Sequence, residues 1–243
     1  MLPKRKRKLD DRLAACASLV RENCKLADIG TDHAYLPIAL AQEGRIQQAI
    51  ASDIHVGPLQ KAAMHVRKYG LEEKIQTRIS DGLEVIFPNE ADDIVIAGMG
   101  GELIARIIDS APWLQDPDKH LILQPMTAPE ELRCALREHG FSVREETAVL
   151  VEEKVYGVML AVYDPEHPNT DPLFPYLGLL NGTTPQGAAY IERQIRFYRN
   201  KAEGLKRAGK LAQAAPVEQL LCQMEQRLNE TKGGSVHDNG TAD

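Results

Sequence analysis

Long apolar runs are missing from this chain of 243 residues, of which 43% are hydrophobic and 26% charged. No segment reaches the roughly 18 consecutive apolar residues that a membrane-spanning helix needs. The basic run Lys4–Lys8 is followed by Asp10 and Asp11, where a secretory signal would carry its apolar core. The sequence therefore predicts a globular, cytoplasmic protein without membrane contact, with one or two domains of about 150 residues each. We expect a monomer.

Closely spaced cysteines are missing as well. The chain contains no C-x-x-C pair, which zinc ribbons and thioredoxin-like redox sites need. Histidines are also scattered, and His55 and His65 are expected to be solvated helix residues. The sequence therefore predicts no metal site, and reduced thiols at all four cysteines. These are Cys16, Cys24, Cys134 and Cys222.

Charge is distributed unevenly over the chain, whose formal net charge is -6. Residues 1–12 carry six basic and two acidic residues, a balance of +4. Residues 190–212 carry seven basic and two acidic residues, a balance of +5, so the remainder carries -15. Two basic segments on an acidic body favour a polyanionic partner bound at defined places. Solvated helix faces produce the same pattern.

Short apolar segments alternate with amphipathic ones along most of the chain. This order predicts a mostly parallel sheet with helices on both faces. The last two expected strands have no helix between them, so we expect them to pair antiparallel at one edge. Strands are expected over 26–30, 46–53, 74–80, 92–97, 120–124, 141–151 and 154–163. Helices are expected over 10–22, 36–43, 57–69, 101–109 and 129–138.

A different pattern follows the last strand. Residues 164–175 contain four prolines and read as a linker. Two long segments with apolar stripes, 185–209 and 214–229, predict a pair of antiparallel helices. Residues 231–243 have no large apolar residue beyond Val236 and predict a disordered tail. We therefore expect three parts, a sheet domain over 1–163, a helical hairpin domain over 164–230 and the tail over 231–243.

The turn after the first expected strand, Asp28–Pro37, opens a helix, as a nucleotide-binding loop does. Gly30 would let a ligand approach the backbone, but Asp32 replaces the middle glycine of the G-x-G-x-x-G motif. A carboxylate at that position repels a pyrophosphate. Asp28 and Asp32 instead suit a cationic cofactor without phosphate. S-adenosylmethionine, with a sulfonium and an α-ammonium group, fits this description.

Further candidate residues for the same cofactor follow the next three strands. Asp53 comes 23 residues after Gly30, and an acidic residue near this spacing accepts from ribose hydroxyls. A carboxylate after the third strand would accept from the adenine amino group, and a glycine turn after the fourth would face the flat base. Each feature alone also fits a plain turn, but their order favours methyl transfer. The additional candidates are Ile54, Asp81, Gly82, Gly98, Met99 and Gly100.

Several segments match one family in order. They are Leu9 with Arg12-Leu13, Ala27–Pro37, Ala51–Asp53 with Gly57–Leu59, Ser80–Leu83, Ala97–Gly101 and Leu123–Pro125. Together they resemble the bacterial TrmK-type tRNA (adenine 22-N1)-methyltransferases, in which serine is more common at the position of Thr31. The resemblance implies a class I, Rossmann-like α/β domain with a seven-stranded sheet, followed by a coiled-coil-like helical domain. It also implies methyl transfer from S-adenosylmethionine to N1 of adenine in tRNA.

The chemistry of that reaction suggests roles for three loop residues. N1 of adenine is nucleophilic when neutral, so in-line placement matters more than a strong base. Asp32 is predicted to accept from the exocyclic amine and stabilise the charge that develops on the purine. His33 is expected to assist or to move a proton, and Tyr35 to stack on the base or bond to it. The alternatives are a helix cap for His33 and core packing for Tyr35.

Basic residues of the first long C-terminal helix are predicted to contact tRNA phosphates. Three of them lie three positions apart and are expected to share a helix face. Phe197 and Tyr198 lie among them, and core packing is expected of at least one. The six candidates are Arg193, Arg196, Arg199, Lys201, Lys206 and Arg207.

Two absences narrow the reaction further. No [D/N]-P-P-[Y/F] motif follows the fourth strand, which argues against N6-adenine methylation. No Pro-Cys pair is present, which disfavours the covalent route to C5 of pyrimidines. The alternatives that stay open are a methyltransferase of another RNA base or of a small molecule, and a non-catalytic RNA-binding protein with a relic Rossmann domain.

Overall fold

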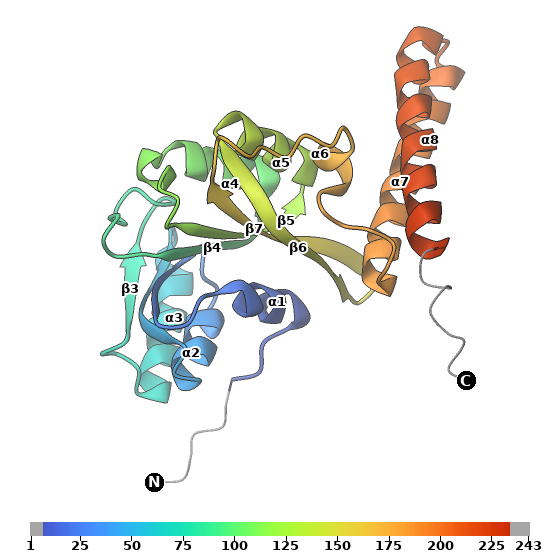
Figure 1. Ribbon diagram of the computed structural model, residues 1–243. Coiled ribbons are helices and arrows are strands. Elements are labelled where there is room, and N and C mark those ends of the chain that lie inside the picture. The colour runs from blue at the N-terminus through green and yellow to red at the C-terminus, as the bar shows by residue number, and fades with distance from the viewer. Residues whose placement is uncertain (1–6, 234–243) are drawn as a thin grey trace, which may run out of the picture.

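Seven strands form a single sheet in the order β3-β2-β1-β4-β5-β7-β6 in the computed structural model, which describes residues 7–233 (Figure 1). The first five strands pair in parallel, while β7 runs antiparallel to both β5 and β6. This arrangement confirms the predicted sheet and its antiparallel edge. The strands are β1 (Cys24–Ile29), β2 (Ile46–Asp53), β3 (Ile75–Ile79), β4 (Asp93–Gly100), β5 (His120–Thr127), β6 (Phe141–Val151) and β7 (Lys154–Tyr163).

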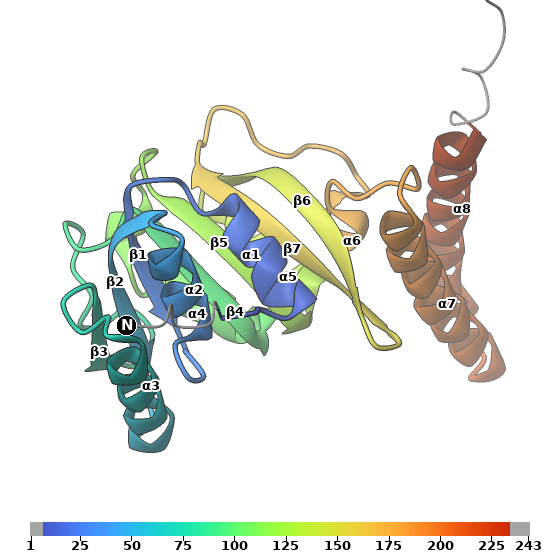
Figure 2. The ribbon, with the colours of Figure 1, turned by 90° about the horizontal axis from the view of Figure 1, so that it is seen from below.

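Helices cover both faces of the sheet, as Figure 2 shows. Side chains of a strand alternate between the faces, so Ile94 and Ile96 join one hydrophobic core and Val95 joins the other. The first core is closed by α4 (Gly101–Asp109) and α5 (Pro129–Glu138), with the short 3-10 helix η1 (Pro112–Leu114) beside them. The second is closed by α1 (Asp11–Leu19), α2 (Tyr35–Gln42) and α3 (Val56–Tyr69).

Several elements differ from their predicted bounds, and α1 and β4 show why. Helix α1 ends at Leu19 because both the backbone N–H and the guanidinium of Arg21 bind Asp93, each at 2.7 Å. Strand β4 continues to Gly100 where a glycine turn was expected after residue 97. The glycines form an irregular strand end in which the register shifts on both sides of Met99. Gly98 has a φ of +82°, a conformation that side chains with a Cβ rarely adopt.

The C-terminal helices pack on each other at one end of the sheet (Figure 1). Helix α6 (Phe174–Leu177) leads to α7 (Pro185–Arg207) and α8 (Leu211–Gly233). The ion pairs Arg199–Glu225 and Lys206–Glu218 show that α7 and α8 run antiparallel. Their apolar stripes form a separate core. Helix α8 extends into the predicted tail. Residues 1–6 and 234–243 lie outside the described part of the chain, and the division into three parts stays a prediction.

A buried ion pair links the helical hairpin to the sheet. Arg133 of α5 donates to Glu146 of β6 at 2.6 Å, and neither side chain is exposed. The same guanidinium donates to the hydroxyl of Tyr190 in α7 at 3.1 Å and to the carbonyl of Pro175 at 3.0 Å. Gly178 passes so close that a Cβ there would overlap the Glu146 carboxylate. This network, the α5–β6–α7 cluster, ties the N-terminal part of α7 to α5 and β6.

Candidate active site

The β1–α2 loop begins with a buried carboxylate. Asp28 ends β1 at 6% exposure, and its Oδ2 accepts a hydrogen bond of 2.6 Å from the Thr31 hydroxyl. Burial raises the pKa of Asp28 to about 6, which the Thr31 hydrogen bond opposes. The Thr31 oxygen in turn accepts from the backbone N–H of Ala34 at 3.2 Å. The loop is therefore held by hydrogen bonds that start at Asp28.

The middle of the loop turns Asp32 outward. His33 and Ala34 have positive φ values of 69° and 55°, a strained conformation for residues with a Cβ. The Asp32 side chain is 77% exposed, and its Oδ1 lies 3.1 Å from Nε2 of His33. Ala34, not His33, is the N-cap residue of α2, and no side chain caps that helix. His33 therefore orients Asp32 and does not serve as the helix cap.

A cavity of about 360 Å³ lies between this loop and the end of β4. Strands β1 and β4 are neighbours at the point where the strand order reverses, the usual ligand position in such sheets. Five predicted site residues meet in the cavity wall: Asp28, Gly30, Asp32, Tyr35 and Gly98. The N-terminal end of α1 and strand β5 also line the cavity, with Asp10, Arg12, Leu13 and Met126. The structure thus brings the acidic loop and the glycine segment together.

The remaining cofactor candidates lie outside this cavity. Asp53 ends β2, next to β1, and its Oδ1 accepts from the backbone N–H of His55 at 2.7 Å. Met99 packs directly on Gly30, where its methyl carbon would overlap a Cβ. Gly100 lines a separate hollow of about 610 Å³. Ile54, Asp81 and Gly82 are partly or fully exposed on the same edge of the sheet. Their cofactor contacts stay predictions.

His65 was predicted to be solvated, and this is wrong. Its ring centroid lies 5.2 Å from that of His33 and 5.4 Å from that of Tyr35. Its Nδ1 donates to the backbone carbonyl of His33 at 3.2 Å, because a carbonyl can only accept. The spacing of the buried residues Ala62 and Val66 in α3 places His65 on the same face, a signal that was available from the sequence.

Tyr35 is also stacked on the protein itself. The guanidinium carbon of Arg7 lies 3.4 Å from the Tyr35 ring centroid, and the His33 ring is nearly parallel at 5.0 Å. One ring face is therefore covered by Arg7. Tyr35 still lines the cavity, and its contact with the target base stays a prediction.

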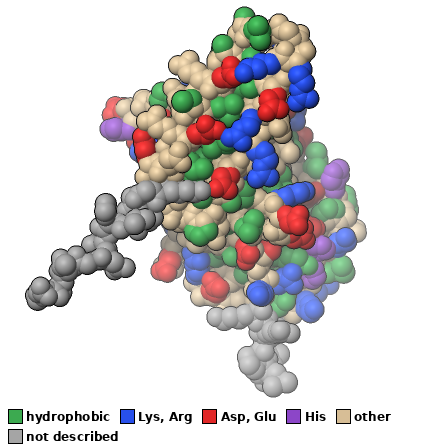
Figure 3. Space-filling model, turned by 90° about the vertical axis from the view of Figure 1, so that its right-hand side faces the viewer, with side chains coloured by type: hydrophobic (Ala, Val, Ile, Leu, Met, Phe, Trp, Pro, Cys, Tyr) green, Lys and Arg blue, Asp and Glu red, His purple; other side chains and the backbone are tan. Residues whose placement is uncertain are grey.

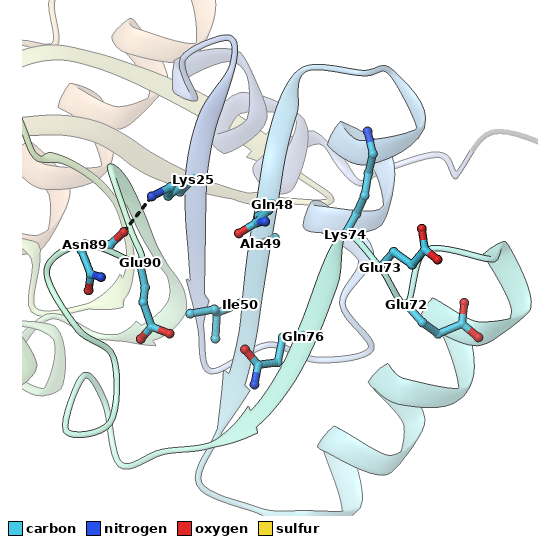
Figure 4. Close-up of a pocket in the computed structure, with 10 residues that line it drawn as sticks. All are labelled: Lys25, Gln48, Ala49, Ile50, Glu72, Glu73, Lys74, Gln76, Asn89 and Glu90. Carbon is cyan, nitrogen blue, oxygen red and sulfur yellow. Dashed lines mark hydrogen bonds between the residues drawn. The ribbon is translucent and has the colours of Figure 1, made fainter.

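A second hollow, of about 400 Å³, lies at the opposite ends of the strands (Figure 4). Its walls carry both signs of charge, including Lys25, Lys74 and Glu90. Lys25 donates to the carbonyl of Asn89 at 2.9 Å, and Glu90 binds Arg78. None of the predicted site residues lies here. We assign no ligand to this hollow.

The predicted RNA-binding residues of α7 differ in their surroundings. Arg193 donates to the carbonyl of Val155 at 2.6 Å, which directs it toward the sheet. Arg199 pairs with Glu225 of α8 at 2.6 Å. Six residues turn a helix to a direction about 120° away, so Arg193 and Arg199 do not share a face as expected. Arg196 has no ion-pair partner within residues 7–233.

The three remaining predicted RNA-binding residues have partners within the hairpin. Lys206 pairs with Glu218 and Arg207 with Glu203, while Lys201 lies 5.5 Å above the Tyr198 ring. Basic and acidic side chains are accordingly interspersed on this side of the molecule (Figure 3). Tyr198 is buried in the helical core, as expected for one of the two aromatics, whereas Phe197 is 54% exposed.

Comparison with known proteins shows which family has this sequence and fold. A family model described as a methyltransferase domain matches residues 9–159. The tRNA (adenine(22)-N(1))-methyltransferase of Bacillus subtilis is 39% identical over 154 residues, which span 63% of this chain and 65% of that enzyme. The crystal structure of the B. subtilis m1A22 tRNA methyltransferase TrmK matches with a TM-score of 0.81 at 30% identity, covering 90% of this chain and 99% of that one. The chain belongs to the TrmK family.

A further TrmK-like structure carries the methyl donor. The putative tRNA (m1A22) methyltransferase of Streptococcus pneumoniae, in complex with S-adenosyl-L-methionine, is 31% identical with a TM-score of 0.74. The match covers 89% of this chain and 99% of that chain. Membership of the TrmK family confirms the predicted class I methyltransferase fold with a helical C-terminal region. Within residues 7–233, no helix is both long and apolar enough to cross a membrane, and no cluster of His, Cys, Asp and Glu side chains is placed to hold a metal.

Proposed function

We propose that this chain transfers a methyl group from S-adenosylmethionine to N1 of adenine in tRNA, at the nucleotide named for its TrmK relatives, adenine 22. The observation that carries the proposal is the buried Asp28 beside the outward-facing Asp32 in one cavity. Arg12 is the single basic side chain among the described residues that line it. This charge pattern fits a ligand with an ammonium and a sulfonium and does not fit a pyrophosphate.

Different residues around this cavity bind different parts of the cofactor. S-adenosylmethionine, when bound, supplies a methyl group on a positively charged sulfur. Asp28 holds the ammonium end, which favours its ionised form. Asp53, at the end of the neighbouring strand, accepts from the ribose hydroxyls. Gly30 and Gly98 keep the backbone close to the cofactor.

Asp32 faces the adenine. Its carboxylate accepts from the exocyclic amine and stabilises the positive charge that the purine gains when N1 takes the methyl group. His33 orients Asp32 through the 3.1 Å contact. No proton leaves N1 before attack, because that nitrogen has a free lone pair. Placement of N1 in line with the methyl group is therefore the main task of the site.

The helical hairpin supplies contacts to the tRNA backbone in this proposal. Arg196 and the exposed Phe197 are the side chains that we assign to these contacts. For Arg199 and Lys206, tRNA phosphates compete with internal carboxylates. The target base must leave its stack to reach the cavity. We place the enzyme in the cytoplasm with its substrate and treat it as a monomer.

The decisive experiment is nucleoside mass spectrometry after incubation of the protein with unmodified tRNA and S-adenosylmethionine. We expect 1-methyladenosine, and mapping of the modified position should find nucleotide 22. Formation of 6-methyladenosine or of a methylated pyrimidine would exclude the N1 reaction. Methylation of a metabolite mixture without any change in tRNA would favour a small-molecule enzyme instead.

A further inference from the structure

The turn that carries Asp32 has a backbone conformation that needs outside support. His33 and Ala34 both have positive φ values, and residues with a Cβ keep such a conformation only where the surrounding structure holds them in it. Thr31 holds one side of the turn, because its side-chain oxygen accepts from the Ala34 backbone N–H at 3.2 Å. No side chain caps α2, the helix that follows. The other side of the turn, at His33, therefore needs a separate contact.

His65 of α3 makes that contact. Its Nδ1 donates to the backbone carbonyl of His33 at 3.2 Å. The helical hydrogen-bond pattern of α2 offers no donor to this carbonyl, since the residue four positions on is Pro37, which has no backbone N–H. The two histidines are 32 positions apart, so this hydrogen bond ties the turn to a different helix.

The position of His65 is set largely by α3. Ala62 and Val66, close to it on the same face of that helix, are both buried in the second core. The His65 ring centroid also lies 5.2 Å from that of His33 and 5.4 Å from that of Tyr35, with interplanar angles of 39° and 26°. An imidazole that is placed by a packed helix and by two neighbouring rings is a fixed donor.

The support reaches Asp32 through His33. Nε2 of His33 lies 3.1 Å from Oδ1 of Asp32, whose side chain is 77% exposed. An exposed carboxylate has several staggered rotamers available, and this contact selects one of them. Because the ring and the carbonyl of His33 belong to one residue, a change in its backbone moves the ring and displaces the carboxylate. A misplacement of about 1 Å at a reacting centre costs up to roughly 100-fold in rate.

We infer that His65 is a positioning residue of the methyl transfer: through the His33 carbonyl it holds the β1–α2 turn in the conformation that presents Asp32 to the target base. The inference rests on the proposed function for the reaction and its base. It goes further by giving a role to α3, which contributes none of the described residues that line the cavity.

Two variants of His65 separate its hydrogen bond from its ring packing. His65→Phe keeps a ring but has no donor, and we expect it to lower kcat on tRNA roughly 3- to 10-fold, the scale of one hydrogen bond. His65→Gln should recover most of that loss, because its amide nitrogen is a donor of similar reach. The KM for tRNA and the affinity for S-adenosylhomocysteine should stay within about twofold of wild type. Met64→Ala, at the exposed neighbouring position of α3, is the matched control.

A double-mutant cycle shows whether His65 acts through Asp32. In the Asp32→Asn background, His65→Phe should change kcat by less than about twofold, because the carboxylate that it positions is gone. A general loss of folding or packing would instead lower kcat by the same factor in both backgrounds. That result, or equal losses in His65→Phe and His65→Gln, overturns the positioning role.

A readout without catalysis completes the test. Neutral histidine carries its proton on one of the two ring nitrogens, and donation to the His33 carbonyl requires the Nδ1–H tautomer at His65. Nitrogen-15 spectra of the wild-type imidazoles in alkaline buffer should show this tautomer, in a signal that His65→Gln removes. The Nε2–H tautomer at His65 would overturn the inference in an active enzyme. A wild type that leaves tRNA unmethylated refutes the proposed function and this inference together, whereas an active wild type with unchanged kcat in His65→Phe refutes this inference alone.

Discussion

At the residue scale, the protonation of Asp28 should make both protein stability and cofactor binding depend on pH. Its pKa in the folded protein, about 6, is above the ordinary value of 3.8 because burial disfavours the charged form. Between these two values the folded state binds more protons than the unfolded state, so the free protein loses stability as pH rises through this window. The loss is at most about 3 kcal/mol. A bound ammonium reverses the balance, because it favours the ionised carboxylate.

Cofactor affinity should therefore rise with pH. We expect the dissociation constant of S-adenosylmethionine to fall up to about tenfold between about pH 5 and about pH 7, with a plateau above it, because Asp28 must lose its proton to pair with the ammonium. Isothermal titration calorimetry in buffers of different ionisation heat measures both the affinity and the proton released. Asp28→Asn should bind more weakly and show a flat profile. A wild-type affinity that does not change over this range would contradict the pairing.

Asp32 should act on the transfer step more than on cofactor binding. Its side chain is largely exposed beside the cavity and is not buried among the cofactor-holding groups. We expect Asp32→Asn to lower kcat roughly 100-fold, the scale of losing one charge-stabilising group, with affinity for S-adenosylhomocysteine within about threefold of wild type. His33→Gln should have a smaller effect, because it only orients Asp32. Retention of full kcat in Asp32→Asn would remove the carboxylate from the reaction.

The sequence predicted that Asp28 and Asp32 lie close together, and the structure places both in one cavity. This was predictable because the two residues are near each other in the chain and follow a strand with a clear apolar pattern. The hydrogen bond of 2.7 Å from Arg12 to the Gln124 side chain was not predicted, because the two residues are 112 positions apart and no local pattern joins them. Their contact depends on α1 packing across the sheet. The stack of Tyr35 on Arg7 and His65 depends on tertiary packing in the same way.

At the element scale, most strands and helices were predictable because each has a strong hydrophobic period. The predicted ends of helices and strands were wrong where contacts with residues distant in the sequence determine them. Arg21 was predicted to lie in the first helix, but its backbone N–H binds Asp93 and α1 ends before it. Pairing with β5 extends β4 through three residues that were predicted to form a turn. The α5–β6–α7 cluster is a further case, because nothing local to Arg133 or Glu146 indicates that they form a buried pair.

In the α5–β6–α7 cluster, removal of one charged partner should lower the free energy of unfolding strongly, whereas replacement of both should not. Glu146→Ala leaves a buried arginine uncompensated, and we expect it to lower the free energy of unfolding by about 3–5 kcal/mol in urea titrations. Arg133→Met combined with Glu146→Leu should recover much of that loss, because the buried charge is gone. Glu225→Ala, which breaks the exposed pair with Arg199, should cost less than about 1 kcal/mol. Similar losses for the buried and the exposed variants would show that the cluster is not a structural link.

At the scale of the whole molecule, the proposed function requires two separated regions to bind one substrate. The cavity lies between β1 and β4 in the middle of the sheet, while α7 and α8 stand beyond its β6 edge (Figure 1). An RNA that reaches both regions has to be folded and rigid, which favours tRNA over a short oligonucleotide. The α5–β6–α7 cluster then matters for function, because it sets the angle at which the helical hairpin meets the RNA.

Arg196 gives the sharpest test of that engagement, because no internal carboxylate holds it within residues 7–233. We expect Arg196→Ala to raise the dissociation constant for tRNA several-fold and to reduce the slope of log affinity against log salt by about 1, the value for one phosphate contact. Arg199→Ala should change the slope less, since its partner Glu225 is released at the same time and repels the RNA. Filter binding at several salt concentrations gives both slopes, and calorimetry with S-adenosylmethionine should show that cofactor affinity is unchanged. An unaltered slope in Arg196→Ala would place the RNA on a different face of the hairpin, because a phosphate contact cannot be lost without releasing fewer counterions.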